Sequence, residues 1–171
     1  MTDTLESIAA EVRACRACRL QEAALQAVPG EGPRSARLFF VGQAPGAMED
    51  QTGRPFAGRA GQFLNQMLAE IGLERGDIFV TSVAKHFPPD NRLPRKDEVE
   101  ACLPFLIRQI QVVDPEIVVL MGKVAEQVRD HSVLAGRKVL VTVHPAAAMR
   151  FPAMAERMRK DFRKLRQMLG S

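Results

Sequence analysis

The stretch "RLFFVGQAPGAMEDQTGRPFAGRAGQFLNQMLAEIG", residues 37–72, decides the fold class of this chain. Residues 37–42 are a short apolar run closed by glycine, which is typical of a buried strand. In residues 58–72 the apolar side chains recur at helical spacing, at Phe63, Leu64, Met67, Leu68 and Ile71. Gly72 is a helix stop signal. A strand, a glycine-rich loop and a helix in this order indicate the α/β class.

The same alternation continues to the end of the chain. Further strands are predicted at 77–83, 116–122 and 137–145, and further helices at 95–113, 123–130 and from Ala153 onward. Pro104 is expected in a first turn or at a kink of its helix, because proline cannot donate a helical hydrogen bond. This rhythm predicts a parallel sheet with helices on both faces, whose ligands bind outside the carboxyl ends of the strands.

Length and composition fit a single domain spanning residues 1–171. Hydrophobic residues make up 46% of the chain and charged residues 26%, as in ordinary globular proteins. The first residues are acidic where a signal peptide would be basic, and no apolar run approaches the roughly 20 residues of a membrane span. We therefore expect a cytoplasmic protein, a monomer without membrane contact.

The net charge of +4 favours polyanionic partners only mildly. Between residues 150 and 166 the chain holds seven basic residues and two acids. The basic ones are Arg150, Arg157, Arg159, Lys160, Arg163, Lys164 and Arg166. From charge alone, the simpler interpretation is a solvated helix face.

The three cysteines are an odd number for a disulfide framework. Cys15 and Cys18 have the C-x-x-C spacing of metal and iron–sulfur sites, and the chain holds one more cysteine, Cys102. Either this pair is not a metal site, or a residue other than cysteine completes it.

Three unusual stretches fall at predicted strand ends, where an α/β protein binds its ligand: residues 42–61, 82–94 and 144–150. The glycines of the first let backbone approach a ligand, but their spacing is neither a dinucleotide fingerprint nor a P-loop. Phe56 is a candidate to stack on a flat ligand, although a core phenylalanine is commoner. His144 ends a strand beside small residues, where a functional role and a structural one are about equally expected.

These stretches, "GQAPGAMEDQTGRPFAGRAGQFL", "VTSVAKHFPPDNRLPRKDEVEAC" and "VHPAAAMR", with "CRACRL" before them, resemble the motifs of the family 4 uracil-DNA glycosylases. This is the iron–sulfur-containing bacterial and archaeal branch, and the resemblance runs from about Cys15 to Arg150. It implies an α/β/α sandwich around a four-stranded, mainly parallel sheet, and excision of uracil from DNA.

The resemblance also implies a [4Fe–4S] cluster. The family's four cysteines match Cys15, Cys18 and Cys102, while the third position is occupied by His86. Histidine can ligate iron in such clusters. We expect either that His86 is the fourth ligand or that three cysteines hold a degraded cluster, with a structural role in both cases.

By the same resemblance, Phe56 stacks on the flipped base and the backbone N–H groups of Gly42 to Ala44 hold its carbonyls. His144 donates a hydrogen bond to the carbonyl on which negative charge develops. Lys85, Arg150 and the basic C-terminal helix become candidates for DNA phosphate contacts.

Three departures from the family pattern bear on the chemistry. Gln43 replaces a glutamate and can position a water but cannot take its proton, so base catalysis is weaker or passes to Asp50 or Glu49. Ser82 replaces an asparagine that reads the base, and its hydroxyl discriminates less. Ala146 replaces a serine that could orient the catalytic histidine.

The first expectation is therefore a monofunctional glycosylase that removes uracil or another deaminated base from DNA. A second is a non-catalytic or altered-specificity DNA-binding relative, and a third is an iron–sulfur redox module. The third is disfavoured because it has no need for Phe56 and His144.

Overall fold

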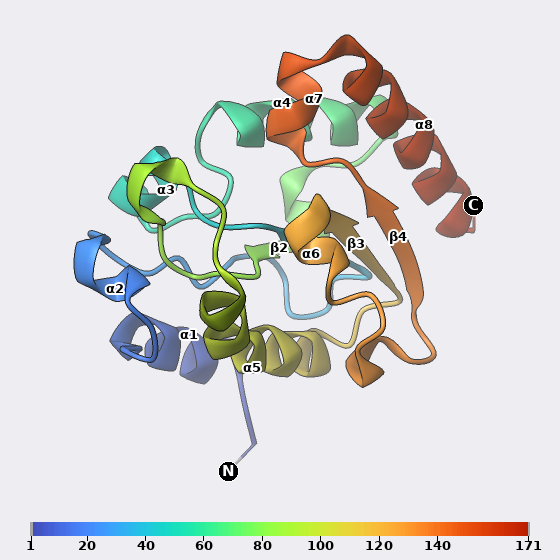
Figure 1. The fold of residues 1–171 in the computed structure, drawn as a ribbon. Coiled ribbons are helices and arrows are strands. Elements are labelled where there is room, and N and C mark those ends of the chain that lie inside the picture. The colour runs from blue at the N-terminus through green and yellow to red at the C-terminus, as the bar shows by residue number, and fades with distance from the viewer. Residues whose placement is uncertain (1, 171) are drawn as a thin grey trace.

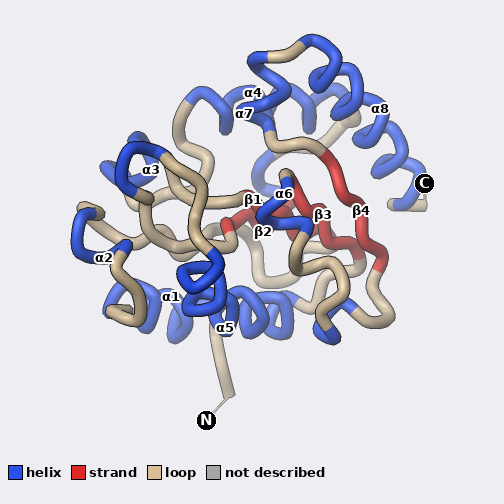
Figure 2. The backbone as a smooth tube through the Cα atoms, in the orientation of Figure 1, coloured by secondary structure: helices blue, strands red, loops and turns tan. Residues whose placement is uncertain are grey.

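Four parallel strands form the central sheet, in the order β2-β1-β3-β4 (Figure 2). The computed structural model describes residues 2–170. The strands are β1 Leu38–Gly42, β2 Ile78–Ser82, β3 Ile117–Met121 and β4 Lys138–Thr142. In the register, Gly42 lies opposite Ser82. All strands end at one edge, and the chain order reverses between the adjacent strands β1 and β3, which is where such sheets form a ligand crevice.

Helices cover both faces of this sheet (Figure 1). One face packs against α4 and α8, and the other against α5 and α6. The longer helices are α1 Leu5–Ala14, α4 Arg59–Glu70, α5 Lys96–Val113 and α8 Pro152–Met168. The short ones are α2 Leu20–Ala23, α3 Ala47–Thr52, η1 Arg75–Asp77, η2 Pro89–Asn91, α6 Lys123–Glu126, η3 Ser132–Leu134 and α7 Pro145–Arg150.

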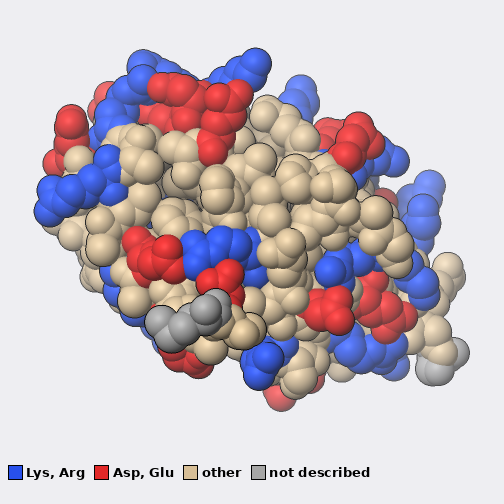
Figure 3. All heavy atoms as spheres, turned by 90° about the horizontal axis from the view of Figure 1, so that it is seen from below, with Lys and Arg blue, Asp and Glu red and all other residues tan. Residues whose placement is uncertain are grey.

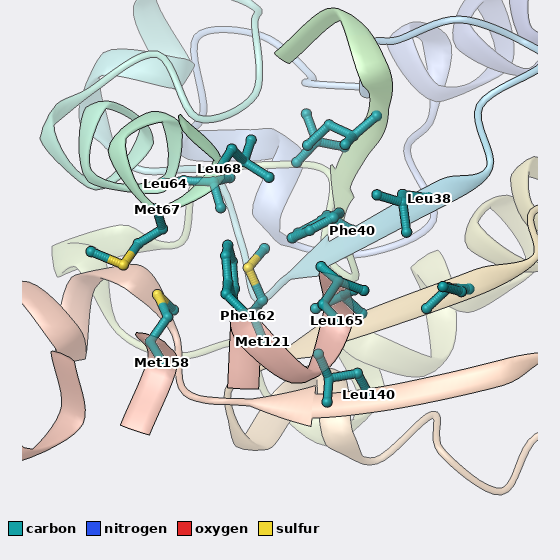
Figure 4. Close-up of a cluster of buried hydrophobic side chains, with 14 of the residues drawn as sticks. Leu38, Phe40, Leu64, Met67, Leu68, Met121, Leu140, Met158, Phe162 and Leu165 are labelled. Carbon is teal, nitrogen blue, oxygen red and sulfur yellow. The ribbon is translucent and has the colours of Figure 1, made fainter. Parts of the chain in front are cut away.

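Alternate side chains of the strands enter two separate cores. In β1, Leu38 and Phe40 join the core under α4 and α8, while Phe39 and Val41 join the core under α5. Figure 4 shows the first of these cores, where Phe40 faces Phe162 of α8. Their ring centroids are 5.9 Å apart in an edge-to-face arrangement, which aromatic pairs favour. Burial on both faces explains why the two central strands, β1 and β3, are nearly continuous apolar runs.

The N-terminal helix α1 packs on the outside of α5. Its apolar residues Ile8 and Val12 are buried against Phe105 and Val112. Arg108 of α5 pairs with Asp3 and Glu11 across this contact. On the face seen in Figure 3, acidic and basic side chains are interspersed, so this face is not a one-sign surface for a polyanion.

The predicted α/β class and the four-stranded parallel sheet are confirmed. Helix α5 runs through Pro104 well beyond its first turn, so of the two expected positions for this proline the first turn was wrong. The short helices α3 and α7 were not predicted, because neither has room for an apolar stripe. Within residues 2–170, no helix is both long and apolar enough to cross a membrane.

Replacing Phe162 by alanine tests the packing of α8. The side chain is fully enclosed in the core, so Phe162→Ala should lower the free energy of unfolding by about 3–5 kcal/mol. Urea unfolding measures this change. Arg163→Ala on the exposed neighbouring position should change it by less than about 0.5 kcal/mol. Equal effects of the two variants would contradict the packing described.

Candidate active site

A cavity of about 190 Å³ opens at the carboxyl edge of the sheet. It draws on all three stretches that were predicted from their places at strand ends. Its lining consists of Val28, Ala44, Pro45, Gly46, Glu49, Pro55, Phe56, Ala60, Ser82, Asn91, His144 and Ala146. The walls are largely apolar with a few convergent polar groups, as in most small-molecule pockets.

The rings of Phe56 and His144 lie close together in this cavity. Their centroids are 5.8 Å apart and their planes differ by 26°. Gly42, the last residue of β1, makes this arrangement possible. A Cβ there would stand 2.7 Å from Cζ of Phe56 and 3.1 Å from Oγ of Ser82, so any side chain at this position would displace the ring. The end of β1, the ring of Phe56 and the hydroxyl of Ser82 therefore meet at one point of the cavity.

His144 is held in one tautomer by the start of α7. Its Nδ1 accepts a hydrogen bond of 3.1 Å from the backbone N–H of Ala146. The neutral ring consequently carries its proton on Nε2, which becomes a hydrogen-bond donor. Burial lowers the pKa of His144 to about 4, so the ring is uncharged at neutral pH.

The carboxylate of Glu49 pins the glycine loop at two points. One oxygen accepts from the N–H of Gly46 at 2.8 Å, the other from the N–H of Gly58 at 2.7 Å. Glu49 also lines the cavity, and it is the carboxylate that the structure brings to the site.

Two residues that were predicted to be catalytic point elsewhere. The amide oxygen of Gln43 accepts from the N–H of Val124, at the start of α6. The carboxylate of Asp50 is buried and accepts from the N–H of Leu25 at 2.8 Å, which ties the N-terminal segment to α3. Neither side chain lines the cavity. Gln43 nevertheless lies near His144, because a Cβ at Gly122 would touch both its Oε1, at 2.8 Å, and Cβ of His144, at 3.2 Å.

Asn91 is a cavity residue that sequence reasoning missed. It lies in η2 with a φ of 55°, a left-handed conformation that asparagine tolerates better than most residues. The Pro-Pro-Asp-Asn run indicated a tight turn, but nothing in the pattern showed that this turn folds back over the sheet. Its side-chain amide has a separate donor and a separate acceptor. The hydroxyl of Ser82 uses one oxygen for both and therefore discriminates less between ligands.

The expectation that Lys85 contacts DNA is corrected by the fold. Lys85 is 1% exposed, and its Nζ donates to Oγ1 of Thr81, to the carbonyl of Ser82 and to Oε1 of Gln109, at 2.6 to 2.8 Å. Burial lowers its pKa to about 7. Arg150 is exposed at the end of α7, as a phosphate contact requires, and its guanidinium lies 5.6 Å from the ring centroid of Phe151.

The predicted cluster ligands come from three elements that face one region. Cys15 ends α1, His86 follows β2, and the two residues line a common cavity of about 230 Å³. The pKa of Cys102 is raised to about 11, mainly by burial, and the charges of Cys18 and Cys15 contribute to the rise. The three thiols are thus near enough to interact, although in residues 2–170 no three metal-binding side chains are grouped as ligands of a metal ion.

An ion-pair network holds the C-x-x-C segment over α5. Arg19, next to Cys18, donates to Glu98 at 3.0 Å, and Arg92 donates to the same carboxylate at 2.8 Å. The hydrogen bond from Arg92 is the main reason that the pKa of Glu98 falls to about 2. Glu98 lies one turn before Cys102, so this network brings the two cysteine segments together.

The pKa of His144 predicts a pH-dependent stability. Between pH 6.5 and about 4, the unfolded chain binds a proton on His144 that the folded chain does not bind. The free energy of unfolding should therefore fall as the pH drops through this window, by up to about 3 kcal/mol from this residue.

Urea titrations of the wild type and His144→Gln at several pH values measure this contribution. The buried His86 acts in the same direction, because burial lowers its pKa too, so the test is the difference between the two proteins. The variant should show the shallower pH dependence. If the free energies of unfolding of the two proteins change with pH in parallel, the pKa of His144 is not lowered by burial.

Comparison with known proteins identifies the family. Residues 29–170 match the Uracil DNA glycosylase superfamily. A type-4 uracil-DNA glycosylase of Sulfurisphaera tokodaii is 41% identical over 97% of this chain and 85% of its own length. A type-4 uracil-DNA glycosylase of Pyrobaculum aerophilum is 42% identical over 88% of this chain and 87% of its own length. One from Saccharolobus solfataricus is 40% identical over 99% of this chain and 88% of its own length. The chain therefore belongs to the uracil-DNA glycosylase superfamily and, within it, to the type-4 uracil-DNA glycosylases.

Proposed function

We propose that this chain excises uracil from DNA by hydrolysing the N-glycosidic bond, with the cavity at the sheet edge as its base-binding site. The observation that carries the proposal is the pairing of Phe56 and His144 over a glycine strand end, in a cavity sized for a base. The substrate is DNA that contains a deaminated base. The base must leave the stack to reach such a site.

Several of the lining groups have a role in this reaction. The ring of Phe56 offers a flat face for the base, and Ala44 and Ser82 border the same space. Nε2–H of His144 donates to the base carbonyl on which negative charge develops as the bond breaks. Because the imidazole is neutral, it stabilises this charge as a donor and keeps its proton.

The water that completes the hydrolysis must bind among the polar groups that line the cavity. Glu49 and Asn91 are the candidates, and the negative charge of Glu49 also favours the cationic sugar. Gln43 keeps its position as a helix cap in this scheme, and Asp50 serves as an anchor of the N-terminal segment. Asn91 also supplies an amide to the base pocket, in which the family's asparagine is replaced by Ser82.

Removing the imidazole tests the catalytic role. His144→Ala should lower the single-turnover rate of abasic-site formation on uracil-containing single strands by about 10²–10³. His131→Ala is a matched control, since His131 caps η3 through the same Nδ1 contact, at 3.0 Å, away from the cavity. It should leave the rate within about twofold.

The same assay includes hypoxanthine and xanthine, which decides between uracil and other deaminated bases. A wild type that excises none of these bases, yet binds the oligonucleotides, would overturn the proposed activity. DNA binding would then be the remaining function.

We further propose that the chain holds a [4Fe–4S] cluster through Cys15, Cys18, Cys102 and His86. The donor set of three thiols and one imidazole suits iron, and the Arg19–Glu98 contact supports its convergence. When bound, the cluster supplies a structural cross-link between the N-terminal segment, the loop after β2 and α5.

Iron analysis tests this assignment. The purified protein should be brown with roughly four iron atoms per chain, and His86→Ala should lower both the iron content and the melting temperature. His131→Ala is again the control. Full iron retention and an unchanged spectrum in His86→Ala would remove His86 from the ligand set. Iron-free wild-type protein from an anaerobic preparation would contradict the cluster itself.

A further inference from the structure

Phe56 has a backbone conformation that needs support from its surroundings. Its φ is 49°, in the left-handed region that a bulky residue without a special constraint rarely adopts. Such a conformation is energetically unfavourable and persists only where neighbouring contacts hold it. In this conformation the ring lies against Gly42 and beside His144. What holds the Phe56 backbone therefore holds the base-stacking ring.

Arg75 supplies these contacts from the first position of η1. One guanidinium nitrogen donates to the carbonyl of Phe56 at 3.1 Å, and the other donates to the carbonyl of Pro55 at 2.8 Å. The first nitrogen also reaches Oδ1 of Asn65 on α4, at 3.3 Å. The planar guanidinium of Arg75 thus binds two successive backbone carbonyls, which lie about twenty residues earlier in the sequence.

The surroundings of Arg75 fit this use of its charge. The side chain is half-buried, and burial lowers its pKa, but a guanidinium remains charged in proteins. Its hydrogen-bond acceptors in residues 2–170 are the three neutral oxygens just named. The neighbouring Arg54, by contrast, donates from Nε and Nη2 to the two carboxylate oxygens of Glu31.

The carbonyl of Phe56 is also constrained from α4. A Cβ at Gly61 would lie 1.7 Å from this oxygen, so glycine is required for the helix to pass so close. The carbonyl consequently lies between the backbone of α4 and the guanidinium of Arg75. Steric exclusion on one side and hydrogen bonds on the other leave the peptide little freedom.

We propose that Arg75 is a positioning residue for base recognition: it clamps the Pro55 and Phe56 carbonyls and so fixes the phenyl ring against which the flipped base stacks. This role rests on the proposed glycosylase function. It is distinct from a phosphate contact, because the guanidinium is already occupied by protein carbonyls.

A double-mutant cycle tests whether Arg75 acts through the ring. Arg75→Gln should lower the single-turnover rate of uracil excision by about 10- to 10²-fold, because the ring loses its fixed orientation. In the Phe56→Ala background the same substitution should cost less than about threefold, since the ring it positions is gone. Arg75→Lys keeps the charge without the planar guanidinium, and should fall between wild type and Arg75→Gln.

Arg54→Gln is the matched control. Arg54 and Arg75 line one cavity of about 250 Å³, separate from the active-site cavity, but Arg54 binds Glu31. It should stay within about twofold of the wild-type rate. Losses from Arg75→Gln and Phe56→Ala that simply multiply would overturn the proposal, as would an Arg75→Gln rate equal to wild type. If Arg75→Gln fails to fold, the cycle is run with Arg75→Lys and the same criterion applies.

A fluorescence measurement separates this proposal from the catalytic one. The chain has no tryptophan or tyrosine, so Phe56→Trp introduces a single emitter at this position. Adding Arg75→Gln should increase acrylamide quenching of that indole, and equal quenching would contradict the clamp. If quenching changes while the wild type excises no base, the glycosylase function fails and the clamp stands.

Discussion

The parallel hydrogen-bonded ladder between β1 and its two neighbours is the constraint on which the site depends. Parallel strands end at the same edge, so Gly42 and Ser82 are brought opposite each other by register alone. The loop that leaves β1 then has to return to α4 across this edge, which carries Phe56 over Gly42. His144 follows β4 at the same edge and completes the pair of rings. Glu49, Phe56 and Asn91 reach this edge from the loops and short helices that follow the strands, so strand ends and connecting segments together form the cavity.

A buried polar network stabilises this edge from below. The ammonium of Lys85 binds β2 through Thr81 and Ser82, and it binds α5 through Gln109. Thr81 and Gln109 both donate to the carbonyl of Pro29, which draws the segment before β1 into the network. A buried amino group is tolerated only when its N–H donors are satisfied, and Nζ of Lys85 has three acceptors within 2.8 Å. The network therefore couples the base pocket to the helix that carries Cys102.

The sequence was informative where the physical signal is local. Continuous apolar runs and helical spacing predicted all four strands and the long helices α4, α5 and α8, and the strand-end rule predicted where the site lies. Phe56 was singled out by its Gly/Pro setting without periodicity, and His144 by its place at the end of a strand. These are signals that neighbouring residues carry together.

Side-chain direction was less predictable, because it depends on contacts far away in the sequence. Gln43 sits in the glycine loop, but its amide caps α6, eighty residues later. The charge of Lys85 suggested a DNA contact, but its side chain is buried and bonds to Gln109 of α5. The sequence could not show this, because the burial depends on how α5 packs. Asn91 and Arg75 reach the site through turns whose geometry left no periodic signal.

The central claim is that the base binds between the Phe56 ring and the Nε2–H of His144. A crystal structure of the protein with an abasic-site oligonucleotide and free uracil tests this most directly. We expect uracil stacked on Phe56, with one carbonyl oxygen within about 3 Å of Nε2 of His144 and with Nδ1 still accepting from the N–H of Ala146. Uracil bound outside this cavity, or a His144 ring that presents Nδ1 to the base, would contradict it.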